Sequence, residues 1–125
     1  MFALRALACV SVALTLAACG GGDDDSSSPS ATFGVCDLRT LQETCIEVTG
    51  TPNQLVSEKS ACEQAPGTWS SNRCPTTPDL IGCCDYTFGE KFHECFYQGT
   101  PRTDPVDYCT NSMLWSDGVW TPAGS

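Results

Sequence analysis

The chain has 125 residues, of which 15 are acidic, six are basic and ten are cysteine, and its formal net charge is −9. From Phe33 onward, 12 acidic residues stand against five basic ones, a net charge of −7. A domain with this negative charge repels polyanions, so no nucleic-acid partner is expected. The 93 residues from 33 to 125 predict one folded domain.

The N-terminal segment has the pattern of an export signal. Residues 6–19 follow Arg5 and carry no charge; these 14 residues are too few for a spanning helix of about 20 and match a signal-peptide core. The sequence Leu16-Ala17-Ala18-Cys19 resembles a bacterial lipobox. The resemblance implies diacylglyceryl transfer to the Cys19 thiol and removal of residues 1–18. A plain secretory signal and an uncleaved anchor are the less favoured alternatives.

A tether is expected after the lipidated cysteine. Residues 20–32 read GGGDDDSSSPSAT, with almost nothing apolar to bury, which predicts a disordered spacer. Two acyl chains suffice for stable anchoring, so membrane lipid is the expected partner of acylated Cys19. In lipoproteins an Asp directly after this cysteine favours inner-membrane retention. Gly20 stands here, so the outer membrane is favoured over the inner membrane.

Eight further cysteines are the most informative residues of the domain. In a small exported domain an even number of cysteines predicts disulfides, here four. No pair has the C-x₂₋₄-C spacing of a zinc site or of a redox motif, so neither a metal nor a cofactor is expected. The pairing stays open, but neighbouring cysteines on a strand point to opposite faces, so Cys83 and Cys84 should have different partners. The eight are Cys36, Cys45, Cys62, Cys74, Cys83, Cys84, Cys95 and Cys109.

The first elements of the domain are a strand and a helix. The β-branched segment 44–49 predicts a strand. Residues 51–54, Thr-Pro-Asn-Gln, form a helix-start signal with a capping box, and the helix should stop before Pro66. Leu55, Val56, Lys59 and Cys62 are expected on one face of it, with Cys62 placed to bridge to a sheet.

The second part of the domain repeats this order. A short strand at 67–71 precedes a hairpin at 82–97, whose turn is expected at 89–91. A second helix start at 104–107 leads to Cys109 and to a strand at 118–121. The fold class is therefore small disulfide-rich α+β, a short antiparallel sheet with two short helices.

An internal echo links the two helix–strand units. Cys62 is followed by Gly67-x-Trp69, and Cys109 by Gly118-x-Trp120. The echo predicts two similar units on one sheet; coincidence is the alternative, because Gly-x-Trp is a short match.

These features resemble the small Cys-rich lipoproteins of myxobacteria and related bacteria. The resemblance rests on the lipobox and tether, the pair Cys36 and Cys45, the segment GTWSSNRCP at 67–75, Gly82-Cys83, and the late Cys to Gly-x-Trp ending. It implies an exported, lipid-anchored protein and brings no activity with it.

No catalytic residues emerge from the sequence. His93 is the one histidine, and the motifs of serine hydrolases, zinc proteases and phosphate-binding loops are missing. Trp115 breaks the Gly-x-Trp pattern in a loop-like segment and is the expected exposed ligand contact. The favoured function is a non-catalytic binding or interaction module for an envelope protein or polysaccharide. A small hydrolase and a passive surface-display component are the alternatives.

Overall fold

The computed structural model describes residues 32–125. The expected signal peptide 1–18, the lipidation site Cys19 and the tether up to residue 31 lie outside the described residues. The first strand includes Thr32, which pairs with Gly50, one residue before the expected domain boundary at Phe33. Within 32–125 none of the helices has the length and apolar character needed to cross a membrane.

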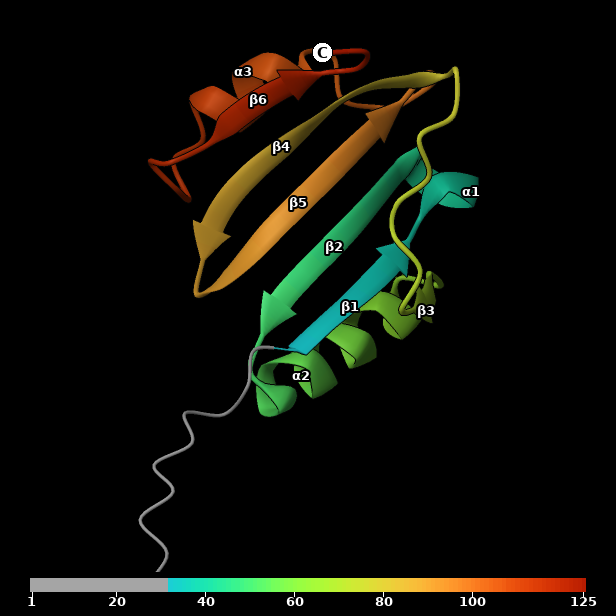
Figure 1. The fold of residues 1–125 in the computed structure, drawn as a ribbon, viewed down its shortest axis with the longest axis vertical. Coiled ribbons are helices and arrows are strands. Elements are labelled where there is room, and N and C mark those ends of the chain that lie inside the picture. The colour runs from blue at the N-terminus through green and yellow to red at the C-terminus, as the bar shows by residue number, and fades with distance from the viewer. Residues whose placement is uncertain (1–31) are drawn as a thin grey trace, which may run out of the picture.

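Six strands form one antiparallel sheet in the order β3-β1-β2-β5-β4-β6 (Figure 1). The strands are β1 (Thr32–Asp37), β2 (Thr44–Gly50), β3 (Thr68–Ser70), β4 (Leu80–Phe88), β5 (Glu90–Tyr97) and β6 (Val119–Pro122). The helices are α1 (Arg39–Gln42), α2 (Pro52–Gln64) and α3 (Pro105–Thr110). The disulfide-rich α+β prediction is confirmed, and the single-turn α1 adds to the two expected helices.

Both longer helices begin as their start signals dictate. At α2 the Thr51 hydroxyl accepts a hydrogen bond from the Gln54 amide, while the Gln54 side chain accepts one from the Thr51 amide at 2.7 Å. At α3 the Asp104 carboxylate accepts a hydrogen bond from the Asp107 amide at 2.9 Å. Proline follows each cap and needs no hydrogen-bond partner there. These caps fix where each helix leaves the sheet.

The sheet consists of two equivalent halves. The first half runs β1-β2-α2-β3 and the second half β4-β5-α3-β6, and each ends in an edge strand that pairs with its own first strand. The two hairpins share a register, since Cys36 lies opposite Ile46 and Cys84 lies opposite Glu94. The halves meet where β2 pairs with β5, and there Ile46 lies opposite Glu94. An approximate twofold axis therefore passes through the Ile46–Glu94 pair.

One row of directly paired residues crosses all six strands and makes this symmetry visible. Directly opposed residues of antiparallel strands share a face of the sheet. The row reads tryptophan, cysteine, isoleucine, then glutamate, cysteine, tryptophan. Its members are Trp69, Cys36, Ile46, Glu94, Cys84 and Trp120. The predicted echo is thus half of a longer repeat that includes the first strand of each half.

Disulfides fasten a helix to each half on the same side of the sheet. Cys36 of β1 is bonded to Cys62 of α2, and Cys84 of β4 to Cys109 of α3. Because Cys36 and Cys84 belong to the row described above, both helices cover one face, which we call the helix face. Figure 1 shows α2 and α3 along opposite edges of the sheet, so its central strands β2 and β5 lie between them.

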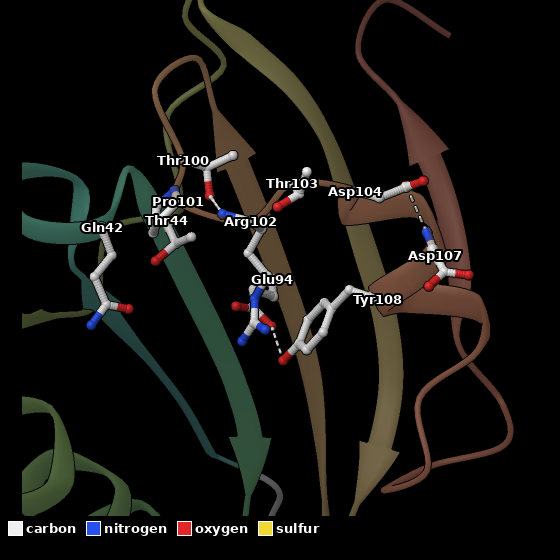
Figure 2. A pocket seen from close by; sticks show the side chains of 10 residues that line it. All are labelled: Gln42, Thr44, Glu94, Thr100, Pro101, Arg102, Thr103, Asp104, Asp107 and Tyr108. Carbon is white, nitrogen blue, oxygen red and sulfur yellow. Dashed lines mark hydrogen bonds between the residues drawn. The ribbon is translucent and has the colours of Figure 1, made fainter.

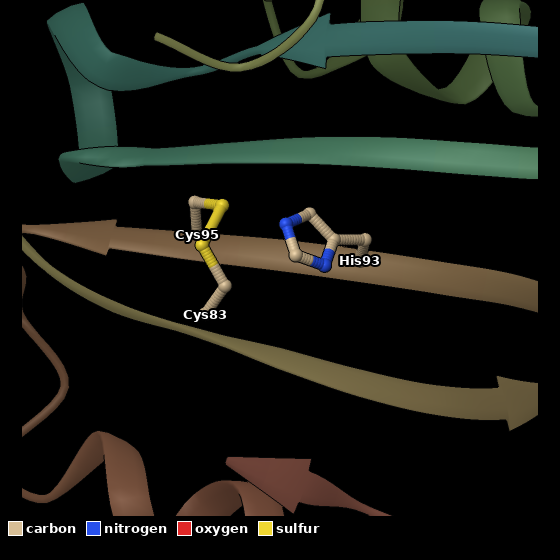
Figure 3. Close-up of side chains that lie close together, drawn as sticks. All are labelled: Cys83, His93 and Cys95. Carbon is tan, nitrogen blue, oxygen red and sulfur yellow. A yellow bond between two sulfur atoms is a disulfide. The ribbon is translucent and has the colours of Figure 1, made fainter. Parts of the chain in front are cut away.

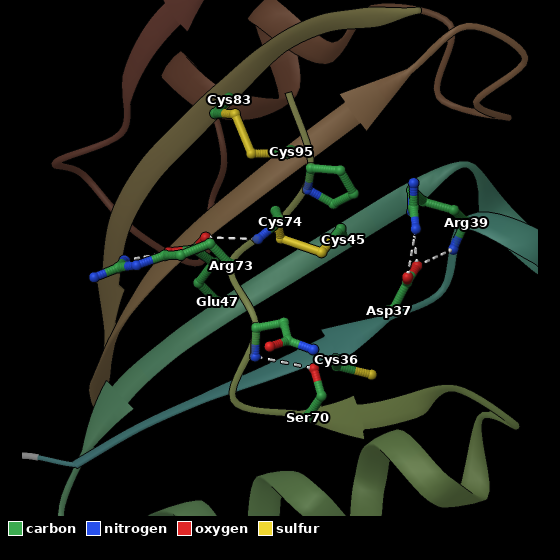
Figure 4. Close-up of a disulfide and its surroundings, with 12 residues drawn as sticks. Cys36, Asp37, Arg39, Cys45, Glu47, Ser70, Arg73, Cys74, Cys83 and Cys95 are labelled. Carbon is green, nitrogen blue, oxygen red and sulfur yellow. Dashed lines mark hydrogen bonds and ion pairs between the residues drawn. A yellow bond between two sulfur atoms is a disulfide. The ribbon is translucent and has the colours of Figure 1, made fainter. Parts of the chain in front are cut away.

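The opposite face, which we call the loop face, is covered by the connection from β3 to β4. Cys74 of this connection is bonded to Cys45 of β2 (Figure 4). The buried Tyr97 donates a hydrogen bond to the Pro75 carbonyl at 2.7 Å. The remaining disulfide joins the facing residues Cys83 and Cys95 of β4 and β5. Cys83 and Cys84 therefore have partners on opposite faces, as predicted.

Candidate functional site

A buried carboxylate lies on the helix face where the two halves meet. Glu94 of β5 is only 5% exposed. Two phenol groups donate hydrogen bonds to its Oε2 atom, Tyr86 of β4 at 3.1 Å and Tyr108 of α3 at 3.3 Å. Among residues 32–125 no hydrogen bond reaches its Oε1 atom. One oxygen of the carboxylate is thus held by the protein and the other is free to accept a donor from a ligand.

Burial determines the electrostatics of this group. Loss of solvation raises the pKa of the Glu94 carboxyl, and the tyrosine hydrogen bonds and the charge of Arg102 oppose that shift without cancelling it. Burial also raises the pKa of the Tyr86 and Tyr108 phenols, with the Glu94 charge acting in the same direction. Both phenols are therefore hydrogen-bond donors at neutral pH. The cluster Tyr86, Glu94 and Tyr108 is called the polar triad below.

A cation lies next to the polar triad. The guanidinium carbon of Arg102, in the segment between β5 and α3, lies 3.6 Å above the centre of the Tyr108 ring. None of the ion pairs within the described range 32–125 involves Arg102. Its charge nevertheless acts on Glu94. Arg102 and Glu94 therefore lie beside the same cavity with opposite charges and form no direct ion pair.

That space is an open cavity of about 610 Å³ (Figure 2). Its floor comes from β2 and β5, and its walls come from α1, the 100–104 segment and α3. Figure 2 shows the side chains of Glu94, Arg102 and Tyr108 close together at its centre. The lining residues are Gln42, Thr44, Glu94, Thr100, Pro101, Arg102, Thr103, Asp104, Asp107 and Tyr108. Roughly 300–1,000 Å³ is the usual size for a small-molecule site.

The first half has apolar residues at each position equivalent to the polar triad. Ile46 corresponds to Glu94 by strand register. Leu38 corresponds to Tyr86, because each lies two residues after the bonded cysteine of the first strand. Ala61 corresponds to Tyr108, because each directly precedes the bonded cysteine of the helix. These three residues line a smaller cavity of about 170 Å³ under α2. The same architecture therefore forms without the polar triad, so the fold alone does not require a buried carboxylate here.

Trp115, the expected exposed ligand contact, is buried, and that expectation of exposure is wrong. It is 9% exposed, and its indole N–H donates a hydrogen bond to the Cys109 carbonyl at 3.0 Å. Its ring stacks on Tyr86 with 3.9 Å between ring centres. The loop folds back over the sheet because this aromatic contact and the indole hydrogen bond are both satisfied inside. Trp115 thus packs against Tyr86 and Tyr108, the two tyrosines of the polar triad.

A second group of polar side chains lies on the loop face. His93 and Asp85 are paired at 2.7 Å between Nδ1 and Oδ1, and both are substantially exposed. Glu47, on the strand next to His93, is buried and accepts hydrogen bonds from Arg73 at 2.6 Å and from the Cys74 amide at 2.8 Å (Figure 4). Those bonds occupy both Glu47 oxygens and hold the β3–β4 connection in place. This carboxylate therefore has a structural role.

Cys83, His93 and Cys95 bring possible metal-ligand atoms within 4.8 Å of one another (Figure 3). The two sulfurs are bonded to each other, whereas a metal ion binds cysteine as the thiolate. Of these three residues, the oxidised form described by the structure therefore offers only the His93 ring nitrogen as a ligand.

No family model matches the chain, and neither a curated protein nor a solved structure matches it significantly. The site therefore has to be interpreted from its own geometry.

Sequence reasoning found the elements around the site but missed its members. Glu94 and Tyr86 both lie in the predicted hairpin at 82–97, yet no local motif marks either residue for chemistry. A signal was present in the repeat. Matching Gly34-x-Cys36 to Gly82-x-Cys84 aligns the two hairpins, and Glu94 then takes the position that Ile46 has in the first half.

Proposed function

We propose that this chain is an exported lipoprotein, anchored to the cell envelope through Cys19, whose domain binds a small ligand in the Glu94 cavity. The observation that carries the ligand-binding part is the polar triad. A buried carboxylate with one free oxygen lines a cavity of about 610 Å³, while the equivalent positions of the first half are apolar. Burying a charge is costly, and the apolar first half forms the same architecture without a carboxylate at this position.

The proposal of a lipid anchor rests on the sequence pattern from Leu16 to Cys19. Gly20, which follows the cysteine, favours the outer membrane as its location. The test is the mass of the protein extracted from membranes of the expressing bacterium. The expected mature form begins at acylated Cys19, and Cys19→Ala abolishes acylation. Cys9→Ala is the matched control, because Cys9 lies in the segment that should be removed. Acylation that persists in Cys19→Ala would refute the assignment.

Binding is tested by the melting temperature of the mature protein in the presence of envelope saccharides, peptides and amino acids. A ligand of the native state raises the melting temperature with concentration. At least one class of ligand should raise the melting temperature of the wild type and should not raise that of Glu94→Gln. Glu63→Gln, which changes an exposed carboxylate of α2, is the control and should respond like the wild type. If no class raises the melting temperature of the wild type, passive display replaces binding as the better proposal.

A small hydrolase is the second candidate, favoured by the Asp85–His93 pair. An orienting acid and a histidine are two parts of a hydrolytic triad, which also needs a nucleophile. No hydroxyl group within the described range is hydrogen-bonded to the His93 ring. Turnover of ester or amide substrates that disappears in His93→Ala and persists in Glu94→Gln would favour this candidate over binding.

A further inference from the structure

We propose that the Glu94 cavity recognises α-amino acids in their zwitterionic form, with the ammonium group on Glu94 Oε1 and the carboxylate on Arg102. This inference rests on the proposed function, because it names the ligand class of the same cavity. It goes further by assigning the two opposite charges of the cavity to two groups of one molecule.

Glu94 supplies an acceptor that is already oriented. The residue is 5% exposed, and the hydroxyls of Tyr86 and Tyr108 both donate to Oε2, which fixes the position of that oxygen. The free Oε1 atom belongs to a group that lines the cavity. An ammonium donor would complete the hydrogen bonding of the carboxylate and compensate its charge.

Arg102 supplies the complementary donor. Its guanidinium carbon lies 3.6 Å from the centre of the Tyr108 ring. Among residues 32–125 the Arg102 side chain donates no hydrogen bond and makes no ion pair, so its N–H groups are available to a ligand. A guanidinium edge matches a carboxylate with two parallel hydrogen bonds. Since the ring under Arg102 carries the hydroxyl that holds Glu94, the two charged groups are linked through one side chain, as Figure 2 shows.

The distribution of charge selects a zwitterion over a simple anion or cation. A simple anion would meet Glu94, Asp104 and Asp107 in the same lining, and a simple cation would meet Arg102. A molecule with both signs on neighbouring atoms satisfies both groups.

Aromatic stacking, the usual support for a sugar ring, is not offered by this cavity. Tyr108 is the aromatic residue of the lining, and Arg102 covers one face of its ring. Its ring also makes edge contacts with Phe96 and Trp115, at 5.9 and 5.2 Å between centres. Charge pairing, and not stacking, is therefore the recognition that these residues support.

Isothermal titration of the mature protein with L-alanine, L-leucine and L-glutamine tests the proposal. At least one should bind, and two derivatives of that amino acid should each bind about tenfold more weakly or worse. The N-acetyl derivative lacks the ammonium group, and the carboxamide lacks the carboxylate. Loss of a charge-assisted hydrogen bond accounts for a change of this size.

Matched variants locate the binding. Glu94→Gln and Arg102→Gln should each weaken binding by about tenfold or more. Glu63→Gln and Arg39→Gln change the same residue types outside the cavity and should leave binding unchanged. The derivative series uses only the wild-type protein, so the proposal stays testable even if Glu94→Gln fails to fold.

Two results would overturn the inference. If the N-acetyl and carboxamide forms bind as well as the parent amino acid, or if none of the three amino acids binds, the zwitterion class is wrong. A chitin-type oligosaccharide that binds the wild type and not Glu94→Gln would leave the proposed function intact with another ligand class. If neither kind of probe responds to Glu94→Gln, the cavity itself is not the binding site.

Discussion

The two halves of this domain share one architecture and differ in their chemistry at its centre. Each half has a hairpin, a capped helix bonded to the first strand, and a tryptophan on a short edge strand. At the junction the first half contributes Ile46 and the second half contributes Glu94. The first half thus carries an apolar residue where the second half carries a buried, hydrogen-bonded carboxylate.

Equivalent apolar residues around Ile46 pack under α2, whereas Glu94, Tyr86 and Tyr108 form hydrogen bonds beside an open cavity. A comparison inside one chain holds the solvent, the length and the disulfide content nearly constant. Differences between the halves can therefore be assigned to the residues that differ.

The largest expected effects come from the helix-fastening disulfides, and they should be equal. Their sequence separations are 26 for Cys36–Cys62 and 25 for Cys84–Cys109, so the loop-closure entropy is nearly identical. Replacing both cysteines of either bridge by alanine should lower the free energy of unfolding by about 2–4 kcal/mol. Denaturant unfolding of the two double variants checks this, and a clear inequality between them would show that the halves are not energetically equivalent.

Glycine under each tryptophan gives the next comparison. A Cβ atom at Gly34 would overlap the Trp69 ring, and one at Gly82 would overlap the Trp120 ring. Gly34→Ala and Gly82→Ala should each cost about 1–3 kcal/mol, the usual range for overpacking. Thermal melts measure the effect. Adding Trp69→Phe to Gly34→Ala should lessen the penalty, and an unchanged penalty would place its cause in the backbone instead.

Removing the polar triad should leave stability nearly unchanged. The triple variant Tyr86→Phe, Glu94→Met, Tyr108→Phe makes the second half as apolar as the first while keeping side-chain size. It should unfold within about 1 kcal/mol of the wild type, because replacing all partners of a buried polar group is close to neutral. Glu94→Met alone leaves the two partly buried hydroxyls of Tyr86 and Tyr108 without their acceptor and should cost about 1–3 kcal/mol. A triple variant that fails to fold would mean that the triad is structural.

The smallest effect is the pH dependence that Glu94 contributes in the second half. The pKa of Glu94 is raised in the folded state above its ordinary value of 4.5 because the group is buried. The folded protein then binds the proton more tightly than the unfolded chain, so this residue's contribution to stability is complete below pH 4.5 and declines as the pH rises through the folded-state pKa. Urea unfolding of the wild type and Glu94→Gln from pH 4 to pH 8 should show the wild type losing stability relative to the variant. A constant difference would contradict the raised pKa.

Local signals in the sequence predicted much of the fold. The Thr51–Gln54 capping box and the Asp104–Pro105 start mark α2 and α3 correctly, and the pattern of residues 82–97 predicts the hairpin of β4 and β5. These signals act over a few residues, so a single chain displays them fully. Helix rotation was less well predicted, since Val56 was assigned to the face of Cys62 but is 70% exposed.

Long-range features required the structure. Disulfide pairing depends on which strands become neighbours, and the cross-sheet row depends on the β2–β5 register, which no turn fixes. The site also depends on long-range packing. Glu94 lies on β5, Tyr108 on α3 and Arg102 between them, and the Cys84–Cys109 disulfide joins α3 to β4 where Tyr108 contacts Glu94. Trp115 was misplaced for the same reason, since its partner Tyr86 lies on a different element.

The brevity of the two outer strands affects how copies of the domain meet. β3 spans Thr68–Ser70 and β6 spans Val119–Pro122, so each outermost strand presents only a few free backbone groups. Pro122, which has no N–H, ends the second of them. Short edge strands and a terminal proline discourage pairing between the sheets of separate molecules. The domain is thereby protected from forming continuous intermolecular sheets where many copies are crowded together.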